Sequence, residues 1–235
     1  RPVDGVELIE DQGVLALSNV PDLPGVAAQL FESLSKEKIN VDLIIQSTHE
    51  GSTNDIAFTV TANDLSKAES ICKGLLNSIG GELSAEGGMS KLSISGAGIM
   101  GRPGIAASFF ETLSRAGINI RLIATSEVKV SCVIDKATGN KALRSVSENY
   151  ELNDTQIRIN PPLNQTEAPE VRGVALDQER AQLSVIRIPD KPGTAASLCS
   201  AMAESGISLD AIVQSERKHT DGSRDISFTL KKEER

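Results

Sequence analysis

Hydrophobic and polar positions alternate in short runs along the chain, between segments that have helical spacing. The clearest alternation places apolar side chains at every second residue of three runs: Ile56, Phe58 and Val60; Val130, Cys132 and Ile134; Ile226, Phe228 and Leu230. This period predicts strands with one buried face, as in an antiparallel sheet that helices cover on one side. Other apolar runs predict strands over 14–18, 41–45, 92–95, 120–123 and 183–188, with closing strands near 82–85 and 156–160.

Helical patterns follow each of three Pro-Gly pairs. Apolar residues recur there at helical spacing, in the columns Leu30, Phe109 and Leu198, then Leu34, Leu113 and Met202. A second helix is predicted over 65–79, and a weaker counterpart carries Leu143, Val146 and Tyr150. The order of elements is βαββαβ, the ferredoxin-like motif.

The pattern is an internal repeat, which decides the architecture. Residues 24–47, 103–126 and 192–215 align without gaps at offsets of 79 and 89 residues. The first and third copies resemble each other more than either resembles the second, which indicates duplication of a pair of modules. The fold class is therefore α+β, with tandem βαββαβ modules whose antiparallel sheets carry helices on one face.

The repeat sets the module boundaries. Module one covers 12–88 and module two covers 89–160, and an extra strand within 3–11 belongs to neither repeat and is expected to join a sheet of this two-module block. Residues 161–170, with three prolines, read as a linker. Module three covers 171–235, with a strand over 171–176 that copies the one at 3–9. Its second helix and last strand are missing, so the natural chain is expected to continue.

Composition narrows the partners. The formal net charge is −8 and aromatic residues make up 3% of the chain. Nucleic acid and anionic membranes repel such a surface, and sheet aromatics for stacking on bases are scarce. Three cysteines without a CxxC spacing indicate reduced core thiols, which is typical of a cytoplasmic protein. We expect small molecules or proteins as partners, with no nucleic acid and no membrane.

Motifs for catalysis are scarce. Gly96, Gly98 and Gly101 match GxGxxG, but the aligned loops of the other copies lack these glycines, and the strand at 120–123 turns directly into a hairpin. We therefore read the motif as a tight turn and not as a dinucleotide site. His49 and His219 lie in polar loops and suggest no metal site. No catalytic residue is predicted.

The turn between the first strand and first helix of each module is a candidate ligand site. A helix N-terminus presents unpaired N–H groups to a carboxylate, and Gly25, Gly104 and Gly193 would let a ligand approach the backbone closely. Asp22 and Asp190 would then accept the α-ammonium group of an amino acid. An aspartate at this position could equally cap the helix or the turn, and the position alone does not distinguish capping from ligand binding.

A difference between the copies favours the ligand. Modules one and three share Asp22, Asp42 and Gln46 with Asp190, Asp210 and Gln214, where module two has Gly101, Arg121 and Thr125. Capping would not require a difference at all three positions. Two module types, one holding an amine and one facing it, would explain the pattern.

At these residues the sequence resembles the ACT-domain regulatory region of an aspartate kinase. The matching stretches are DLPGVAAQLFESLSKEKINVDLIIQS with NDIAFTV, then KLSISGAGIMGRPGIAASFFETLSRAGINIRLIATSEVKVSCVI, then RGVALDQERAQLSVIRIPDKPGTAA with DGSRDISFTL. They cover nearly the whole chain. A second tandem pair from residue 171 is similar to the four-module arrangement of cyanobacterial aspartate kinases.

The resemblance implies feedback inhibition in the aspartate-family pathway by lysine or threonine bound between a first-type and a second-type module. It also implies that strand 3–9 completes the sheet of module two. One wall of the site would be Asp22, Gly25, Ala27 and Gln46, facing Gly104, Ala106, Asn119, Ile120, Ser126 and Glu127. Ala106 stands where related enzymes often have Thr, which puts one hydrogen bond in doubt. Further candidates from the same segments are Val26, Asn40, Val41, Asp42, Ile105, Asp190, Gly193, Ala195, Asp210 and Gln214.

The same resemblance places ATP, Mg²⁺ and aspartate on a kinase domain outside this chain, so we expect no cofactor and no phosphotransferase activity here. The expected partners are amino-acid effectors, that kinase domain and a second copy of the chain in a dimer. The alternative is a stand-alone amino-acid-binding regulator of transcription or of another enzyme.

Overall fold

The computed structural model describes residues 2–48, 53–99, 102, 104–126, 128–161, 176, 178–209, 211–214 and 219–234. Its helices are α1 Val26–Lys36, α2 Leu65–Ile79, α3 Ile105–Arg115, α4 Gly139–Asn149 and α5 Thr194–Glu204. Its strands are β1 Gly5–Pro21, β2 Asp42–Thr48, β3 Thr53–Thr61, β4 Glu82–Ser95, β5 Leu122–Ser126, β6 Lys129–Asp135, β7 Ile157–Ile159, β8 Arg180–Ile188, β9 Ala211–Gln214 and β10 Arg224–Lys231. The α+β class with ferredoxin-like modules is confirmed.

Two long strands join modules one and two. The sheet order is β2-β3-β1-β4-β6-β5-β9-β10-β8, with β7 beside β1. The strands predicted over 3–9 and 14–18 are one continuous strand, β1, and those over 82–85 and 92–95 are both part of β4. Prediction of separate strands was therefore wrong at these places, because alternation does not reveal that a strand runs on into the next module.

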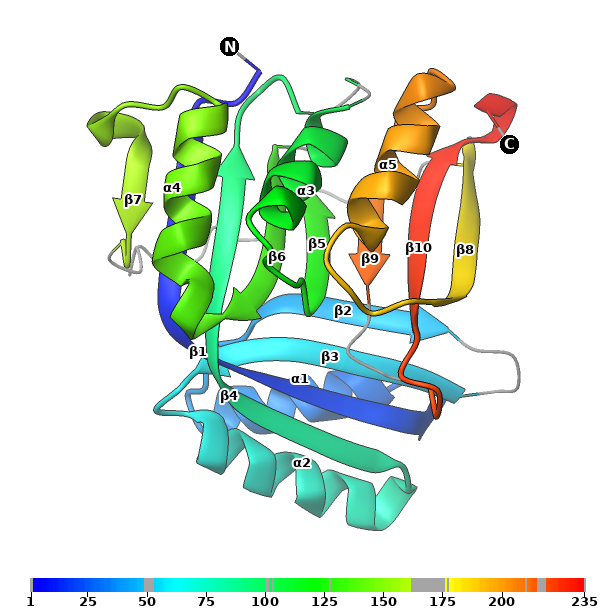
Figure 1. Ribbon diagram of the computed structural model, residues 1–235. Helices are drawn as coiled ribbons and strands as arrows, with labels where there is room; N and C mark the ends of the chain where they lie inside the picture. The colour runs from blue at the N-terminus through cyan, green and yellow to red at the C-terminus, as the bar shows by residue number, and fades with distance from the viewer. Residues whose placement is uncertain are drawn as a thin grey trace.

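Both long strands change direction at the same level. The β1–β4 register shifts on either side of the pair Gln12 and Met89, and Asp11 adopts a φ of 54°. Such bulges bend a strand and increase its twist. As a result, the sheet of module one lies across the sheet of modules two and three, as Figure 1 shows.

The extra strand of module two lies inside its sheet. The N-terminal half of β1 pairs antiparallel with β4, with Val6 opposite Ile94, and parallel with β7, with Val6 opposite Ile157. It is thus inserted between the first and last strands of module two. Of the corresponding strand predicted over 171–176, residues 171–175 lie outside the described residues, as do residues 162–170 of the predicted linker.

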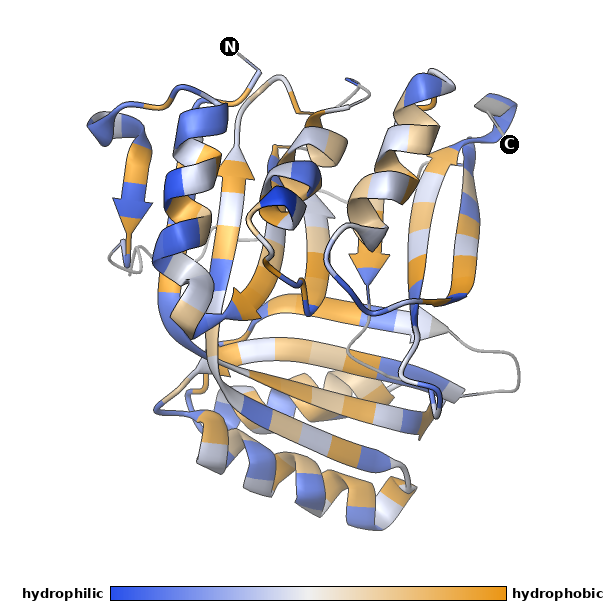
Figure 2. Cartoon of the chain, in the orientation of Figure 1, coloured by the Kyte–Doolittle hydropathy of each residue, from blue (hydrophilic) through white to orange (hydrophobic). Residues whose placement is uncertain are grey.

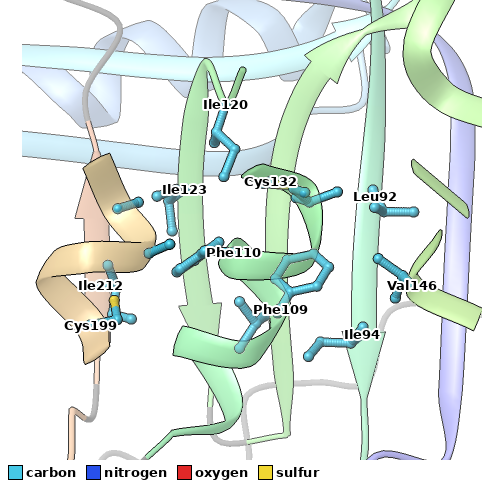
Figure 3. Close-up of a cluster of buried hydrophobic side chains, with 14 of the residues drawn as sticks. Leu92, Ile94, Phe109, Phe110, Ile120, Ile123, Cys132, Val146, Cys199 and Ile212 are labelled. Carbon is cyan, nitrogen blue, oxygen red and sulfur yellow. The ribbon is translucent and has the colours of Figure 1, made fainter. Parts of the chain in front are cut away.

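Modules two and three lie side by side. Strand β5 pairs antiparallel with β9 through Ile123 and Gln214, and helices α3 and α5 are neighbours on the same face. One core runs under both helices, from Phe109 and Phe110 of α3 to Cys199 of α5 and Ile212 of β9 (Figure 3). The interface between these modules therefore contains a continuous apolar core.

A second core lies under α1 and α2 in module one, around Leu17, Leu30 and Phe58. The remaining sheet faces pack on each other through a third cluster, which includes Ala16 and Ile45 of module one and Leu122 and Val133 of module two. Figure 2 shows hydrophobic and hydrophilic residues along the strands. Successive residues of β1 pack on opposite faces, with Leu15 and Leu17 in the second core and Val14 and Ala16 in the third cluster. This packing fixes module one against its neighbours.

Candidate functional site

The three Pro-Gly turns share one backbone geometry. Gly25, Gly104 and Gly193 are the N-caps of α1, α3 and α5, each with a φ of 97°. Residues with a Cβ rarely adopt this conformation, so glycine is needed for the turn itself. At Gly25 an added Cβ would meet nothing within 4 Å, whereas at Gly193 it would lie 2.9 Å from Ser114 Oγ of module two. The turn of module three is therefore packed against its neighbour.

A polar cleft lies between modules two and three. Its walls are the segment after α3 in module two and the turn before α5 in module three. The lining residues include six of the predicted site residues: Asn119, Ile120, Asp190, Gly193, Ala195 and Gln214. Arg224 and the apolar side chains of Phe110, Ile118 and Ile188 complete the polar cleft.

The carboxylate of Asp190 is the centre of the polar cleft. Its Oδ2 lies 2.9 Å from Nε of Arg224, and its Oδ1 accepts a hydrogen bond of 3.1 Å from Nδ2 of Asn119. The side chains of Asp190 and Arg224 are 9% and 1% exposed, so this ion pair is buried. The first turn of α5 adds N–H groups beside it, which suit an anion.

Two side chains of module three also bind the backbone of module two. Gln214 Nε2 donates to the carbonyl of Ile120 at 3.0 Å, and Arg224 Nη1 donates to the carbonyl of Arg121 at 3.0 Å. The remaining cavity is about 20 Å³, which has room for about one water. An amino acid can therefore occupy the polar cleft only if the two walls move apart.

An apolar cleft lies on the other side of the same interface. Here the turn before α3 meets the segment after α5, so the two modules exchange roles. The lining includes the predicted residues Gly104, Ala106 and Ser126, with Thr125, Cys199, Leu209 and Ile212. Thr125 Oγ1 accepts a hydrogen bond of 2.9 Å from the N–H of Ile212. Burial raises the pKa of the Cys199 thiol to about 12, so this sulfur stays protonated.

The wall predicted in module one lies elsewhere. Asp22 is exposed and its Oδ1 accepts a 2.6 Å hydrogen bond from Asn54 Nδ2, while no side chain caps α1. Gly25 is exposed, Val26 and Ala27 are half-buried, and Asn40 and Gln46 are exposed. Asp22 is therefore not a side-chain cap of α1.

The pairing of walls inferred from the resemblance is not the one within this chain. The candidate wall of module two faces module three, because β9 occupies the edge of β5. Residues Asn119 and Ile120 consequently meet Asp190 and not Asp22. Of the remaining candidates, Ile105 begins α3, Val41 is half-buried before β2, and Glu127 and Asp210 lie outside the described residues.

Asp42 lies at a contact between modules one and two. Its carboxylate forms an ion pair with Lys91, whose side chain is 7% exposed between the sheets of modules one and two. Burial alone would raise the pKa of Asp42, but the hydrogen bond and charge of Lys91 outweigh it and lower that pKa below its ordinary value. Asp42 thus joins two modules.

Arg224 is the residue of the site that the sequence analysis did not identify. It lies 34 positions after Asp190, on the third strand of module three, where the alternating pattern draws attention to Ile226 and Phe228. The signal was present in the aligned repeats. Module one has Asn54 before Asp55-Ile56, and module three has Arg224 before Asp225-Ile226.

The glycines at 96 and 98 serve chain packing. A Cβ on Gly96 would lie 2.2 Å from the carbonyl oxygen of Pro2, and one on Gly98 would lie 2.7 Å from the Pro2 Cα. The start of the chain therefore passes directly over this turn. Among the described residues, no group of three or more His, Cys, Asp or Glu side chains could hold a metal ion. No helix in the described part is long and apolar enough to span a membrane.

Comparison with known proteins agrees with this architecture. Models of the ACT domain match residues 18–74 with 92–150, and 181–235. The aspartokinase of Thermus thermophilus is 37% identical over 154 residues, which are 65% of this chain and 38% of that enzyme. The chain thus spans well under half the length of that relative.

Two solved structures are also similar. An aspartate kinase from Synechocystis is 45% identical with a TM-score of 0.90, over 99% of this chain and 41% of that one. The regulatory subunit of aspartate kinase from Thermus thermophilus is 36% identical with a TM-score of 0.59, over 64% of this chain and 99% of that subunit. The chain belongs to the family of ACT-domain regulatory regions of aspartate kinases.

Proposed function

We propose that this chain controls an aspartate kinase by binding an end-product amino acid, lysine or threonine, between ACT modules. The observation that supports the proposal is the polar cleft. There Asp190, Asn119 and Gln214 converge with the first turn of α5 at a junction of two modules. A carboxylate and a helix N-terminus side by side suit the two charged groups of a free amino acid.

In this arrangement the ligand carboxylate would meet the N–H groups after Gly193. The ligand side chain would be read by the facing wall at Asn119 and Ile120. Binding would change the spacing of modules two and three, because Gln214 and Arg224 bridge the two walls and leave room for about one water. The sheet of module two continues through β1 and β4 into module one, so the change can reach the rest of the protein.

The kinase domain would supply the sites for ATP, Mg²⁺ and aspartate, as part of a four-module enzyme in the cytoplasm. We also propose that chains pair as dimers through module one. Its strand β2 is at the end of the sheet order, and the related strand β9 of module three pairs with a neighbouring module. Light scattering at several concentrations tests this, and a monomer throughout would contradict it.

Calorimetric titration of lysine and threonine tests the effector site. We expect Asn119→Ala to weaken binding about tenfold or more, since a hydrogen bond to a charged group contributes about 1.5–3 kcal/mol. Asn40→Ala is the matched control, because Asn40 is the aligned residue of module one and is exposed. Equal losses in the two variants, or no binding of either amino acid to the wild-type chain, would contradict the proposal.

A further inference from the structure

Modules one and three carry the same backbone around their first-turn aspartates. Val20 is the register partner of Asn54, and Ile188 is the register partner of Arg224. Next to each pair the strand bulges at a residue with a φ of 56°, Asn19 or Arg187. Asn54 of module one and Arg224 of module three are therefore equivalent in structure as well as in sequence.

An aspartate side chain on the neighbouring strand binds the backbone of each bulge in the same way. The N–H of Asn19 donates to Asp55 Oδ1 at 2.9 Å, and the N–H of Arg187 donates to Asp225 Oδ1 at 2.9 Å. The difference lies in the side chain that reaches the first-turn aspartate. Asn54 gives Asp22 a neutral donor at 2.6 Å, whereas Arg224 gives Asp190 a cation at 2.9 Å.

We propose that Arg224 is a specificity-determining residue that occupies, within the protein, the place of a ligand ammonium in the polar cleft. Its guanidinium pairs with Asp190 and also donates to the carbonyl of Arg121 across the interface. Arg224 thereby bridges the two walls of the cleft of module three. The inference rests on the proposed function only for the identity of the ligand.

Two consequences follow. An amino acid that uses Asp190 must first displace Arg224. The cleft of module three therefore binds such ligands more weakly than it would with a neutral side chain at position 224. Displacement also removes the hydrogen bond to Arg121, whose side chain forms an ion pair with Glu86 of β4. Release of Arg224 thus loosens a contact between module three and the strands that lead into module one.

The test is Arg224→Asn, which places the side chain of module one at the equivalent position. Asparagine can still donate to Asp190, as Asn54 does to Asp22. The matched control is Arg187→Asn, which removes the same charge three residues from Asp190 and installs the residue that module one has at the equivalent bulge. Arg224→Lys is a third variant that keeps the charge near Asp190, in case the asparagine variant does not fold.

Amide hydrogen exchange without ligand gives the first measurement. We expect exchange at 118–121 and 194–197 to become at least fivefold faster in Arg224→Asn and to stay unchanged in Arg187→Asn. Arg224→Lys should fall between them, because lysine lacks the planar fork that reaches two acceptors. Wild-type exchange in both Arg224 variants would overturn the proposal.

Calorimetric titration with threonine and with lysine gives the second measurement. We expect at least one of them to bind tenfold tighter to Arg224→Asn than to the wild-type chain, a difference of about 1.4 kcal/mol. Unchanged or weaker binding would overturn competition between Arg224 and the ligand. Faster exchange with no binding of either amino acid to any variant would support closure by Arg224 and reject the proposed function instead.

Discussion

Gln214 of module three donates a hydrogen bond to the carbonyl of Ile120 of module two, across 94 positions of sequence, at 3.0 Å. The donor is 6% exposed, so the bond is shielded from water. Within the described residues, Gln214 is also the register partner of Ile123 where β5 pairs with β9. One glutamine thus serves both the strand pairing and the wall of the polar cleft.

We expect Gln214→Ala to destabilise the interface of modules two and three by about 1–3 kcal/mol, because a buried carbonyl loses its donor. Urea unfolding measures the change. The aligned Gln46 is exposed, so Gln46→Ala should stay within about 0.5 kcal/mol of wild type. Equal effects of the two substitutions would show that the bond to Ile120 does not stabilise the interface.

The two first-turn aspartates should differ in stability. Asp190→Asn leaves Arg224 buried without its counter-charge, which typically costs about 3–5 kcal/mol. Asp22 is exposed beside a neutral partner, so Asp22→Asn should cost no more than about 1 kcal/mol. Unfolding in urea at pH 7 compares them, and a smaller loss for Asp190→Asn than for Asp22→Asn would refute the buried pair.

The Asp42–Lys91 pair predicts a dependence on pH. The pKa of Asp42 is lowered in the folded protein, so its stabilisation is present above the ordinary value of 3.8 and is lost as the pH falls through the lower folded pKa. The carboxylate is half exposed, so we expect Asp42→Asn to lower Tm at pH 7 by only roughly 2–4 °C, or about 1 kcal/mol.

That difference in stability between wild type and Asp42→Asn, followed by urea unfolding, should shrink as the pH falls below 3.8 and disappear below the lowered pKa of Asp42. Glu32→Gln is the control, because the Glu32–Lys36 pair is exposed on the surface of α1. It should change Tm by less than Asp42→Asn does at pH 7. A difference that stays unchanged from pH 7 down to the lowest pH at which the protein remains folded would mean that the charge of Asp42 is not its source.

Glycine-to-alanine substitutions should have opposite signs at two sites. At Gly96 a Cβ would overlap the backbone of Pro2, so Gly96→Ala should cost about 1–3 kcal/mol by displacing the start of the chain. At Gly74, within α2, a Cβ meets nothing within 4 Å, and alanine should stabilise by about 0.5–1 kcal/mol. Thermal unfolding of both variants tests this, and a neutral Gly96→Ala would contradict the close packing on Pro2.

The alternating runs and the repeat predicted the βαββαβ modules, and the aligned helices and strands lie where they were expected. Those signals are local, because each depends on side chains two to four residues apart. The choice of partners is not local. Asn119 meets Asp190 because module three lies beside module two, where β5 pairs with β9. Asp190 and Arg224 belong to one module, and the pairing of β8 with β10 brings them together. The repeat does identify the positions that differ, such as Asn54 and Arg224, but it cannot say what lies opposite them.

The pairing of Gln12 with Met89 has a consequence for how such chains are built. The polypeptide leaves module two at Gln12 and returns to it at Met89, which is the register partner of Gln12. Module one is therefore inserted between two paired strands of module two. A genetic insertion or deletion at that site can add or remove a whole module without rerouting any other strand. The sheet of module two can therefore keep its strand order around an inserted module.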